Sequence, residues 1–438
     1  MKATNNGDTI SGIGRRRGAS SSSVSNNARI SAIVFAGSFI LVSALLFIIS
    51  HNLSVANQDT SSSYIDAPSS RGSIRKSQNN INVPFYDGEW GEIMRGEVNL
   101  VEIDVHRMRD TTDGYYKGAK AIFCKLDWDA YKKDPPSLPM FRFLVSKSDC
   151  NDSQNQISVD LATLAKKARA SSGVKSMNPT GFVFHESRVG STLVANSLTA
   201  MNPAANRVYS ESNPINSALK TDNTQLFRDV VYLMGLTNSA EENNMFFKVS
   251  SIGSKKISLV REAFPTAPWI FVYRDPVQTM MSHLDPRKVG SSRGRIQAVC
   301  TRARRHPEQD LIDLVAQQGR TVEEISDHEF CAAHLASLCQ SALNELKKSN
   351  TGRAVEYDGL IDKLLDEIIP NHFGVPVDTE SRQRIMEVSK TYSKARGDND
   401  ADWVEDSAKK EEHSTEEIRN ASELFLSKSY SELQKYSD

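Results

Sequence analysis

Twenty consecutive positions near the start of the chain carry no charge and are mainly hydrophobic. Residues 30–49 read ISAIVFAGSFILVSALLFII. Twenty helical residues rise about 30 Å, which matches the hydrocarbon core of a bilayer. The pattern therefore predicts a transmembrane helix, which we assign to residues 30–50. A buried core helix is the alternative, although such a helix seldom has Ser- and Asn-rich flanks on both sides.

The charges on the two sides of this run are unequal, and they indicate an orientation. Five basic residues and one acidic residue precede it: Lys2, Arg15, Arg16, Arg17, Arg29 and Asp8. After it, the next Lys or Arg is Arg71. By the positive-inside rule, residues 1–29 form a cytosolic tail and the chain beyond the run lies across the membrane. A cleaved signal peptide would have a shorter apolar core nearer the start, so we expect an uncleaved signal anchor with single-pass, type II topology.

Downstream of the hydrophobic run the pattern changes twice. Residues 51–82 are rich in Ser, Asn, Gln and Asp and have little periodicity, which predicts a flexible stem. Between residues 83 and 170, β-like hydrophobic runs alternate with turn-rich pieces; the runs are LVEIDVHRM, KAIFCKLDW and MFRFLVS. Helical periodicity follows from Val159 to Arg169. We expect a small β-rich accessory region over residues 83–170.

From about residue 171 the pattern alternates between strands and helices. Asp275 followed by Pro276 predicts a helix start, because an acidic N-cap and a proline in the first turn favour initiation. The alternation predicts an α/β fold over residues 171–438, a parallel sheet flanked by helices on both faces. Strands are expected at 182–184, 245–249, 269–273 and 354–357, and helices at 191–201, 255–263, 323–348, 360–369 and 415–435.

Composition narrows the class of protein. The chain of 438 residues has 53 basic and 54 acidic side chains and 39% hydrophobic residues, which excludes a collagen-like, disulfide-scaffold or wholly disordered protein. The net charge of −1 gives no general attraction to nucleic acid, so no nucleic-acid partner is expected. Five cysteines allow two disulfides and one free thiol, with the pairing left open. Sequons at Asn52, Asn151 and Asn420 would lie in the lumen, where they could be glycosylated.

A turn between a predicted strand and a predicted helix has the composition of a phosphate-binding loop. Residues 186–192 read ESRVGST. Backbone N–H groups at a helix start, the flexible Gly190, the hydroxyls of Ser191 and Thr192 and the Arg188 cation suit a phosphate ester. The Gly-Lys-Ser/Thr sequence of a Walker A loop is absent. The alternative is a tight turn in which Gly190 and Ser191 only cap a helix.

A second element points to the same chemistry. Residues 273–276 read YRDP at the end of a buried strand, and Ser282 follows Arg274 by eight positions. Together the two elements resemble those of sulfotransferases that use 3′-phosphoadenosine 5′-phosphosulfate (PAPS). Residues 356–360, EYDGL, also resemble a strand end of that family. The resemblance covers about residues 181–374 and implies a P-loop-like sulfotransferase fold for residues 171–438.

The resemblance implies a role for each of these residues. The 5′-phosphosulfate would be held by Arg188, Val189, Gly190, Ser191 and Thr192, and the 3′-phosphate by Arg274 and Ser282. Arg188 would also stabilise negative charge on the leaving phosphate, which makes it a candidate catalytic residue. PAPS would be the donor substrate, and no metal ion is expected, because the sulfuryl group carries less charge than a γ-phosphoryl group.

An acceptor hydroxyl also needs a general base. Cytosolic members of the family use a His after a Lys-Thr pair, but the matching residues here are Lys248, Val249 and Ser250. Glu211 lies 23 residues after Arg188, resembles the Glu of tyrosylprotein-type members, and is the candidate base. An exposed or N-capping glutamate is the alternative. Lys248, the third candidate catalytic residue, would assist at the sulfuryl group or pair with a carboxylate.

Two stretches of basic residues are less specific. Residues 394–397, KARG, with Trp403 resemble a C-terminal loop of the family that closes over the cofactor, although the spacing differs and a solvated loop is the alternative. The second stretch, 287–305, would face an anionic acceptor such as a sulfated or uronic-acid glycan, or would form solvated surface. Its basic members are Arg287, Lys288, Arg293, Arg295, Arg302, Arg304 and Arg305.

The topology and the resemblance together predict a Golgi-membrane enzyme with a lumenal catalytic domain. It would transfer a sulfuryl group from PAPS to a hydroxyl of a glycan or protein acceptor. One alternative is a nucleotide-dependent kinase or glycosyltransferase of the same topology; the first should show a Gly-Lys-Ser/Thr loop and the second an Asp-x-Asp motif in a fitting context. The other is a non-catalytic, membrane-anchored binding protein on this scaffold, because Val189 and Ser191 replace the usual Ser and Thr.

Overall fold

The computed structural model describes residues 90–437 apart from 293, 392 and 394–406. The predicted tail, membrane anchor and stem lie outside these residues, as do the KARG loop and Trp403. Within the described part of the chain, no helix is both long enough and apolar enough to span a bilayer.

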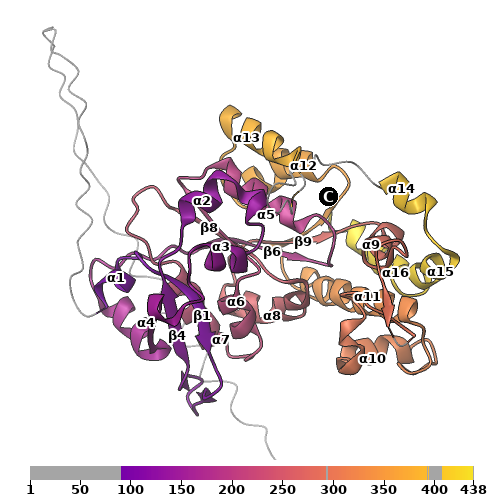
Figure 1. Ribbon diagram of the computed structural model, residues 1–438, viewed down its shortest axis with the longest axis horizontal. Helices are drawn as coiled ribbons and strands as arrows, with labels where there is room; N and C mark the ends of the chain where they lie inside the picture. Colours follow the sequence, from indigo (N-terminus) through magenta and orange to yellow (C-terminus); the bar gives the residue numbers. More distant parts are fainter. Residues whose placement is uncertain (1–89, 293, 392, 394–406, 438) are drawn as a thin grey trace, which may run out of the picture. The chain divides into compact units, whose positions relative to one another are not determined.

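A five-stranded parallel sheet lies at the centre of the described chain (Figure 1). Its strands are β6 (Pro179–His185), β7 (Asn206–Ser210), β8 (Asn244–Lys248), β9 (Trp269–Tyr273) and β12 (Gly352–Glu356). They are ordered β12-β9-β6-β8-β7, and each neighbouring pair is parallel. The predicted parallel sheet is therefore confirmed, and β7 adds a strand that the hydrophobic pattern did not predict.

Side chains alternate between the two faces of this sheet, and each face is covered by different helices. Phe182 and Phe184 belong to one core with residues of α7 and α8, whereas Val183 belongs to a second core with residues of α5 and α13. Helices on both faces make the fold α/β, as predicted. The helices that follow the start of the sheet are α5 (Ser191–Met201), α6 (Asn213–Leu219), α7 (Thr224–Met234), α8 (Ile257–Ala263), α9 (Pro276–Leu284), α10 (Gln309–Ala316), α11 (Asp327–Leu346), α12 (Leu360–Lys363), α13 (Thr379–Ser389), α14 (Ser407–Glu412), α15 (Glu416–Phe425) and α16 (Ser427–Gln434).

Most of the predicted helices are found at the expected places, with some differences in form. Residues 251–256 form a 3-10 turn before α8, and α12 continues as a π-helix over Leu364–His372. The helix expected over 415–435 is divided into α15 and α16 at Leu426. As predicted, Asp275 caps α9, since its carboxylate accepts a hydrogen bond from the Gln278 N–H. A third core joins α9, α10, α11 and α15.

The accessory region mixes strands with helices. Strands β1 (Asn99–Asp104), β4 (Lys120–Cys124) and β5 (Ile157–Asp160) form an antiparallel sheet. Strand β2 (Arg109–Asp110) pairs with β3 (Tyr116–Lys117) in a short ribbon. A further two-stranded pair, β10 (Ser291–Ser292) with β11 (Arg295–Ile296), lies later in the chain. The helices of the accessory region are α1 (Gly91–Met94), α2 (Trp128–Lys133), α3 (Phe141–Lys147) and α4 (Leu161–Ala170).

One strand prediction in this region was wrong. The run MFRFLVS forms helix α3 instead of a strand. Phe141 and Leu144 are its buried residues, and their spacing of three places both on one face of a helix. In such a short hydrophobic run, strand and helix periodicity are easily confused.

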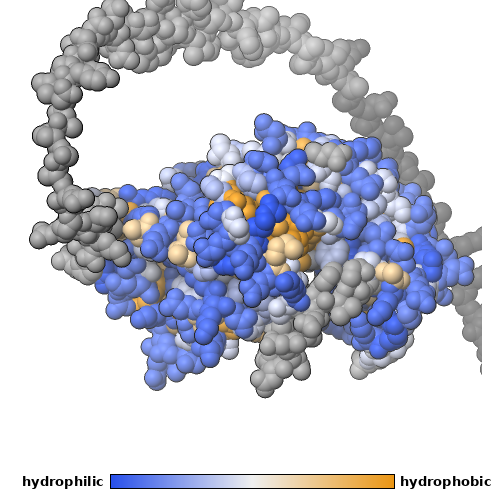
Figure 2. Space-filling view, turned by 90° about the horizontal axis from the view of Figure 1, so that it is seen from above, coloured by the Kyte–Doolittle hydropathy of each residue, from blue (hydrophilic) through white to orange (hydrophobic). Residues whose placement is uncertain are grey.

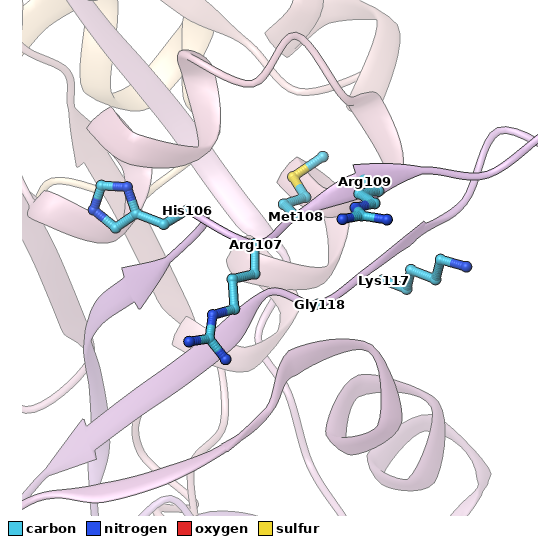
Figure 3. A pocket seen from close by; sticks show the side chains of 6 residues that line it. All are labelled: His106, Arg107, Met108, Arg109, Lys117 and Gly118. Atoms are coloured by element: carbon cyan, nitrogen blue, oxygen red, sulfur yellow. The ribbon is translucent and has the colours of Figure 1, made fainter.

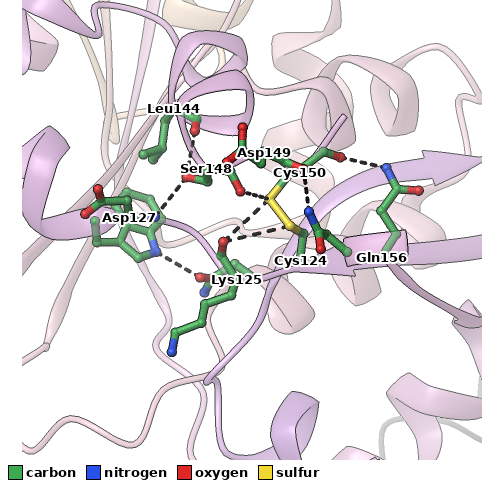
Figure 4. The surroundings of a disulfide bond; sticks show 11 residues. Cys124, Lys125, Asp127, Leu144, Ser148, Asp149, Cys150 and Gln156 are labelled. Carbon is green, nitrogen blue, oxygen red and sulfur yellow. Dashed lines mark hydrogen bonds between the residues drawn. A yellow bond between two sulfur atoms is a disulfide. The ribbon is translucent and has the colours of Figure 1, made fainter. Parts of the chain in front are cut away.

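Two disulfides are present, and Cys339 is a buried free thiol, in agreement with the count expected from the sequence. The Cys124–Cys150 bridge joins the end of β4 to the segment after α3 (Figure 4). The Cys300–Cys331 bridge joins the segment before α10 to the first turns of α11.

Hydrophilic side chains cover most of the face in Figure 2, and hydrophobic ones reach the surface near its middle.

The chain leaves β6 and β9 in opposite directions along the sheet. From β6 it passes through α5 to β7 at one edge, and from β9 it passes through α9, α10 and α11 to β12 at the other edge. In open parallel sheets, ligands bind in the crevice outside the carboxyl ends of two such strands. The topology therefore marks the ends of β6 and β9 as the candidate site without reference to any motif.

Candidate functional site

The carboxyl ends of the five parallel strands carry most of the residues that the sequence singled out. Because the strands are parallel, these ends meet at one edge of the sheet. The residues are His185 and the loop 186–192 after β6, Glu211 after β7, Lys248 at the end of β8, Arg274 after β9 and Tyr357 after β12.

The loop after β6 has an unusual backbone. Ser187, Arg188 and Gly190 have φ angles of 136°, 61° and 84°. A left-handed conformation costs a non-glycine residue roughly 1–2 kcal/mol, and it persists only where the surrounding structure fixes it. The Glu186 N–H donates a hydrogen bond of 3.1 Å to the Val272 carbonyl, which holds the loop against β9. Such strained backbone is concentrated at ligand-binding turns.

Gly190 links this loop to the end of β12. A Cβ atom at position 190 would lie 2.6 Å from ring atoms of Tyr357, so the close approach requires glycine. The guanidinium carbon of Arg274 lies 4.1 Å from the centroid of the same ring. The Tyr357 N–H donates to the Tyr273 carbonyl at 2.9 Å. Gly190, Tyr357 and Arg274 therefore form one packed unit that joins three strand ends.

Arg188, Arg274 and Ser282 meet along α9. The Arg188 Nε donates to the Ser282 carbonyl at 3.2 Å, and the Ser282 hydroxyl donates to the Gln278 carbonyl at 2.8 Å. The Arg274 Nε donates to the Gln278 side-chain oxygen at 2.8 Å. Arg274 also donates to the Ser407 hydroxyl of α14, at 2.7 Å. The structure thus brings together the three residues for which the resemblance implies phosphate binding.

The other loop residues differ in what they can offer a ligand. The Val189 side chain is fully buried in the core beside α5, so only its backbone can face a ligand. Ser191 and Thr192 are buried in the first turn of α5. Gly190 is the N-cap of this helix and brings no side-chain oxygen to its first N–H groups. N–H groups in this position are able to bind an anion.

Glu211 lies beside Lys248 and His185. Its carboxylate forms an ion pair with the Lys248 Nζ, and the His185 Nε2 lies 4.0 Å from Glu211 Oε1. Glu211 has a φ of 52°, and its N–H donates to the Lys248 carbonyl at 2.7 Å. The Lys248 side chain is 1% exposed and that of Glu211 is 20% exposed. The carboxylate thus reaches the surface while its counter-ion stays buried.

These contacts exclude the two alternative roles that the sequence left open for Glu211. Glu211 is not a helix cap, since Ser212 is the N-cap of α6. It is also not a freely exposed side chain, because Lys248 and His185 surround it. Lys248 pairs with a carboxylate, which is one of the two roles considered for it, and its assistance at the sulfuryl group stays a prediction.

Two site residues, His185 and Glu186, were not singled out from the sequence. Burial raises the pKa of the Glu186 carboxyl to about 8. Hydrogen bonds to the Arg274 backbone and the Cys339 side chain lower this pKa by less than burial raises it, and the charge of Asp275 raises it further. The sequence signal that could have identified His185 and Glu186 is their position, because they lie where a buried strand ends and the loop begins. Glu186 therefore places a largely neutral carboxyl beneath the strained loop at neutral pH.

Two acids, the buried Asp285 and the half-buried Asp327, pair with four of the basic residues in the stretch 287–305. Arg287 and Lys288 lie 2.8 and 3.7 Å from the Asp285 carboxylate. The hydrogen bond from Arg287 helps to lower the pKa of Asp285 to about 2. In the same way Arg295 and Arg304 lie 3.0 and 3.5 Å from the carboxylate of Asp327. Arg302 and Arg305 are exposed, and Arg293 lies outside the described residues. These ion pairs give four of the basic side chains a structural role.

No group of three or more His, Cys, Asp or Glu side chains suited to a metal ion is found among residues 90–437 outside the gaps.

Comparisons with known proteins give no family assignment. No family model matches the chain, and no curated protein matches it. Among solved structures, the chain is similar to a sulfotransferase domain from the curacin biosynthetic pathway, with a TM-score of 0.32 and 13% identity over 60% of this chain and 99% of that one. It is also similar to a sulfotransferase domain from the Synechococcus PCC 7002 olefin synthase, with a TM-score of 0.32 and 13% identity over 60% of this chain and 96% of that one. A sulfotransferase from Mycobacterium avium is similar with a TM-score of 0.33 and 11% identity, over 52% of this chain and 71% of that one.

The contact between Gly190 and the Tyr357 ring gives a first testable prediction. Gly190→Ala should lower the free energy of unfolding by about 2–4 kcal/mol, because it adds steric conflict to left-handed strain. Gly114→Ala is the matched control, since Gly114 also has a positive φ but no atom within 4 Å of an added Cβ. Chemical unfolding should show a loss of only about 1–2 kcal/mol for the control. Equal losses in both variants would contradict the proposed packing.

The buried Glu186 carboxyl gives a second prediction, on pH. Its pKa is raised in the folded state to about 8, so between about pH 4.5 and 8 the unfolded chain loses this proton while the folded chain keeps it. Stability must therefore fall as the pH rises through this window. Glu186→Gln should remove a pH-dependent loss on the order of a few kcal/mol. The test is thermal unfolding of both proteins at pH 5 and pH 8, and identical pH dependence would refute the assignment.

Proposed function

We propose that this chain transfers a sulfuryl group from PAPS to a hydroxyl of a glycan or protein acceptor. The observation that carries the proposal is the meeting of two arginines, Arg188 and Arg274, at the crevice between β6 and β9. PAPS has an anionic group at its 5′ end and another at its 3′ end. Two separately anchored guanidinium groups suit such a ligand, because arginine binds phosphate oxygens through several directed N–H groups.

The residues around each arginine fit the group it would hold. At the 5′ end, Arg188 would act with the hydroxyls of Ser191 and Thr192 and with the N–H groups at the start of α5. At the 3′ end, Arg274 would act with Ser282. Arg274 donates to the neutral side chains of Gln278 and Ser407, which a phosphate is able to displace as partners.

The catalytic roles follow from charge and position. PAPS supplies a sulfuryl group already bonded to a phosphate leaving group, so that a new S–O bond to the acceptor forms as the old one breaks. Glu211 would accept the proton of the acceptor hydroxyl, because its carboxylate reaches the surface at the same edge of the sheet as the loop. Lys248 holds that carboxylate in place, and His185 beside it is a second group able to exchange a proton. Arg188 would stabilise the charge that remains on the leaving phosphate.

The proposed location is the Golgi membrane, with the α/β domain on the lumenal side. The twenty uncharged residues at 30–49, and the basic residues before them, support a type II anchor. The two disulfides agree with an oxidising compartment. In this proposal the partners are the membrane, PAPS and a glycan or protein acceptor, without nucleic acid or a metal ion.

Ligand binding is the first test of this function. Adenosine 3′,5′-bisphosphate, the product left by PAPS, should raise the thermal unfolding midpoint of the full-length chain in detergent, and ATP should not. The shift should disappear in Arg274→Ala and persist in Arg382→Ala, a control at an exposed arginine paired with Asp366. Equal shifts with both nucleotides would refute PAPS as the donor.

The general base is tested by sulfate transfer from radiolabelled PAPS into pooled glycans and peptides. Glu211→Asp keeps a charge partner for the buried Lys248 but shortens the side chain by one methylene. We expect transfer to fall at least about a hundredfold while the bisphosphate-induced thermal shift is retained. Glu211→Gln should abolish transfer, and full turnover in either variant would show that Glu211 is not the base.

A further inference from the structure

A basic hollow lies on the accessory region, in a part of the chain to which the proposed function assigns no role. Its volume is about 410 Å³, and Figure 3 shows the side chains around it. Strand β2, the turn before it and strand β3 supply its lining residues, which are His106, Arg107, Met108, Arg109, Lys117 and Gly118.

The outer face of this ribbon concentrates positive charge. Arg109 and Lys117 are directly opposite each other in the β2–β3 pair, so their side chains share one face. Like charges in this position destabilise a strand pair. Within the described residues, Arg107, Arg109 and Lys117 form no ion pair with an acidic side chain, and all three are exposed. This distinguishes them from the basic stretch 287–305, where Asp285 and Asp327 neutralise four of the basic residues.

The inner face of the ribbon fixes it to the α/β domain. Asp110 and Tyr116 form the next cross-strand pair, and both are bound to α7 or its cap. The Asp110 carboxylate accepts a hydrogen bond of 2.7 Å from the Asn223 side chain, and the Tyr116 hydroxyl donates to Asp229 at 2.8 Å. The backbone that carries the cations of the outer face is thus anchored to the α/β domain, although these contacts do not fix the cationic side chains themselves.

Acidic side chains close to the hollow are already engaged. Asp104 accepts a hydrogen bond from the His106 N–H at 2.9 Å, and it lies opposite Lys120 in the β1–β4 pair. Asp113 accepts from the Thr111 hydroxyl. These hydrogen bonds do not cancel the charges of the two carboxylates. The positive character of the hollow rests on its lining, which contains Arg107, Arg109 and Lys117 and no acidic residue.

An exposed aromatic ring lies next to β3. Tyr115 is 58% exposed, one of the most exposed large hydrophobic side chains in the described structure. It lies just before β3, two positions before Lys117, and is exposed whereas the neighbouring Tyr116 is buried. An exposed ring beside cations suits a sugar ring that carries anionic substituents, since the ring face packs on the sugar and the guanidinium groups bind sulfate or carboxylate oxygens.

We propose that the basic surface of the β2–β3 ribbon, with Arg107, Arg109 and Lys117, binds an anionic glycan together with the exposed Tyr115 next to β3. This site is separate from the proposed sulfuryl-transfer site and does not depend on it. A glycan fits better than single-stranded nucleic acid, which usually needs several stacking aromatic rings. It also fits better than an acidic peptide, which would leave Tyr115 without a role.

The direct test is binding of a fluorescent, size-defined heparin oligosaccharide to the full-length chain. The ribbon variant Arg107→Ala/Arg109→Ala/Lys117→Ala should raise the Kd at least about tenfold, because it removes three exposed cations that line the hollow. The control Lys347→Ala/Lys390→Ala/Lys428→Ala removes the same charge from three exposed lysines elsewhere and should change the Kd less than about twofold. Binding should also weaken as salt is added.

Two further measurements separate a glycan site from a general anion site. Tyr115→Ala should weaken binding of the heparin oligosaccharide about threefold and leave that of polyglutamate unchanged. The ribbon variant should keep the thermal unfolding midpoint of the wild type without ligand, which shows that the fold is intact. The proposal is overturned if the ribbon and control variants lose affinity equally, if wild type does not bind heparin, or if polyglutamate or a thymidine oligonucleotide binds as tightly.

Discussion

The parallel pairing of β6 with β9 determines where chemistry is possible in this fold. In this register His185 lies opposite Val272, so the loop that starts at Glu186 begins close to the point where β9 gives way to Arg274. Chain connections diverge from these two strands, which prevents a crossover helix from closing the gap above them. The pairing of β6 with β9 brings Arg188 and Arg274 of the proposed PAPS site close together, although the two residues are far apart in the sequence.

The strain of the loop is supported by its surroundings. Val189 is buried between α5 and the sheet, Gly190 lies against the Tyr357 ring, and Glu186 is enclosed beside Cys339 and Arg274. Each contact restricts a residue whose backbone would otherwise relax to a commoner conformation. A loop fixed in this way has its N–H groups aligned before a ligand binds. The same contacts explain why Val189, unusual for such a loop, is compatible with it, since its side chain serves the core.

Sequence patterns predicted most strands of the sheet and the two turns that carry Arg188 and Arg274, because these elements have signals within a few consecutive residues. Strand β9 is a continuous hydrophobic run, and the Asp275-Pro276 pair starts a helix within four residues. Strand β7 was missed because its buried residues include Asn206 and Arg207, whose polar groups find partners far along the chain, such as Glu242 for Arg207. The pairing of Glu211 with Lys248 and the approach of His185 depend on the order of the strands, which no local pattern contains.

The two basic regions show why counting charges in a sequence does not locate a binding surface. The basic residues at 287–305 are the denser group, yet Asp285 and Asp327 lie among them and form ion pairs with four of the side chains. The ribbon has fewer cations, but its acids bind neutral amide, backbone and hydroxyl groups, and in the described residues none of them forms an ion pair with Arg107, Arg109 or Lys117. An anion approaching the first region must compete with a carboxylate already in place, whereas one approaching the ribbon relieves a repulsion between Arg109 and Lys117. The free energy available for binding an anion therefore depends on which charges the fold leaves uncompensated.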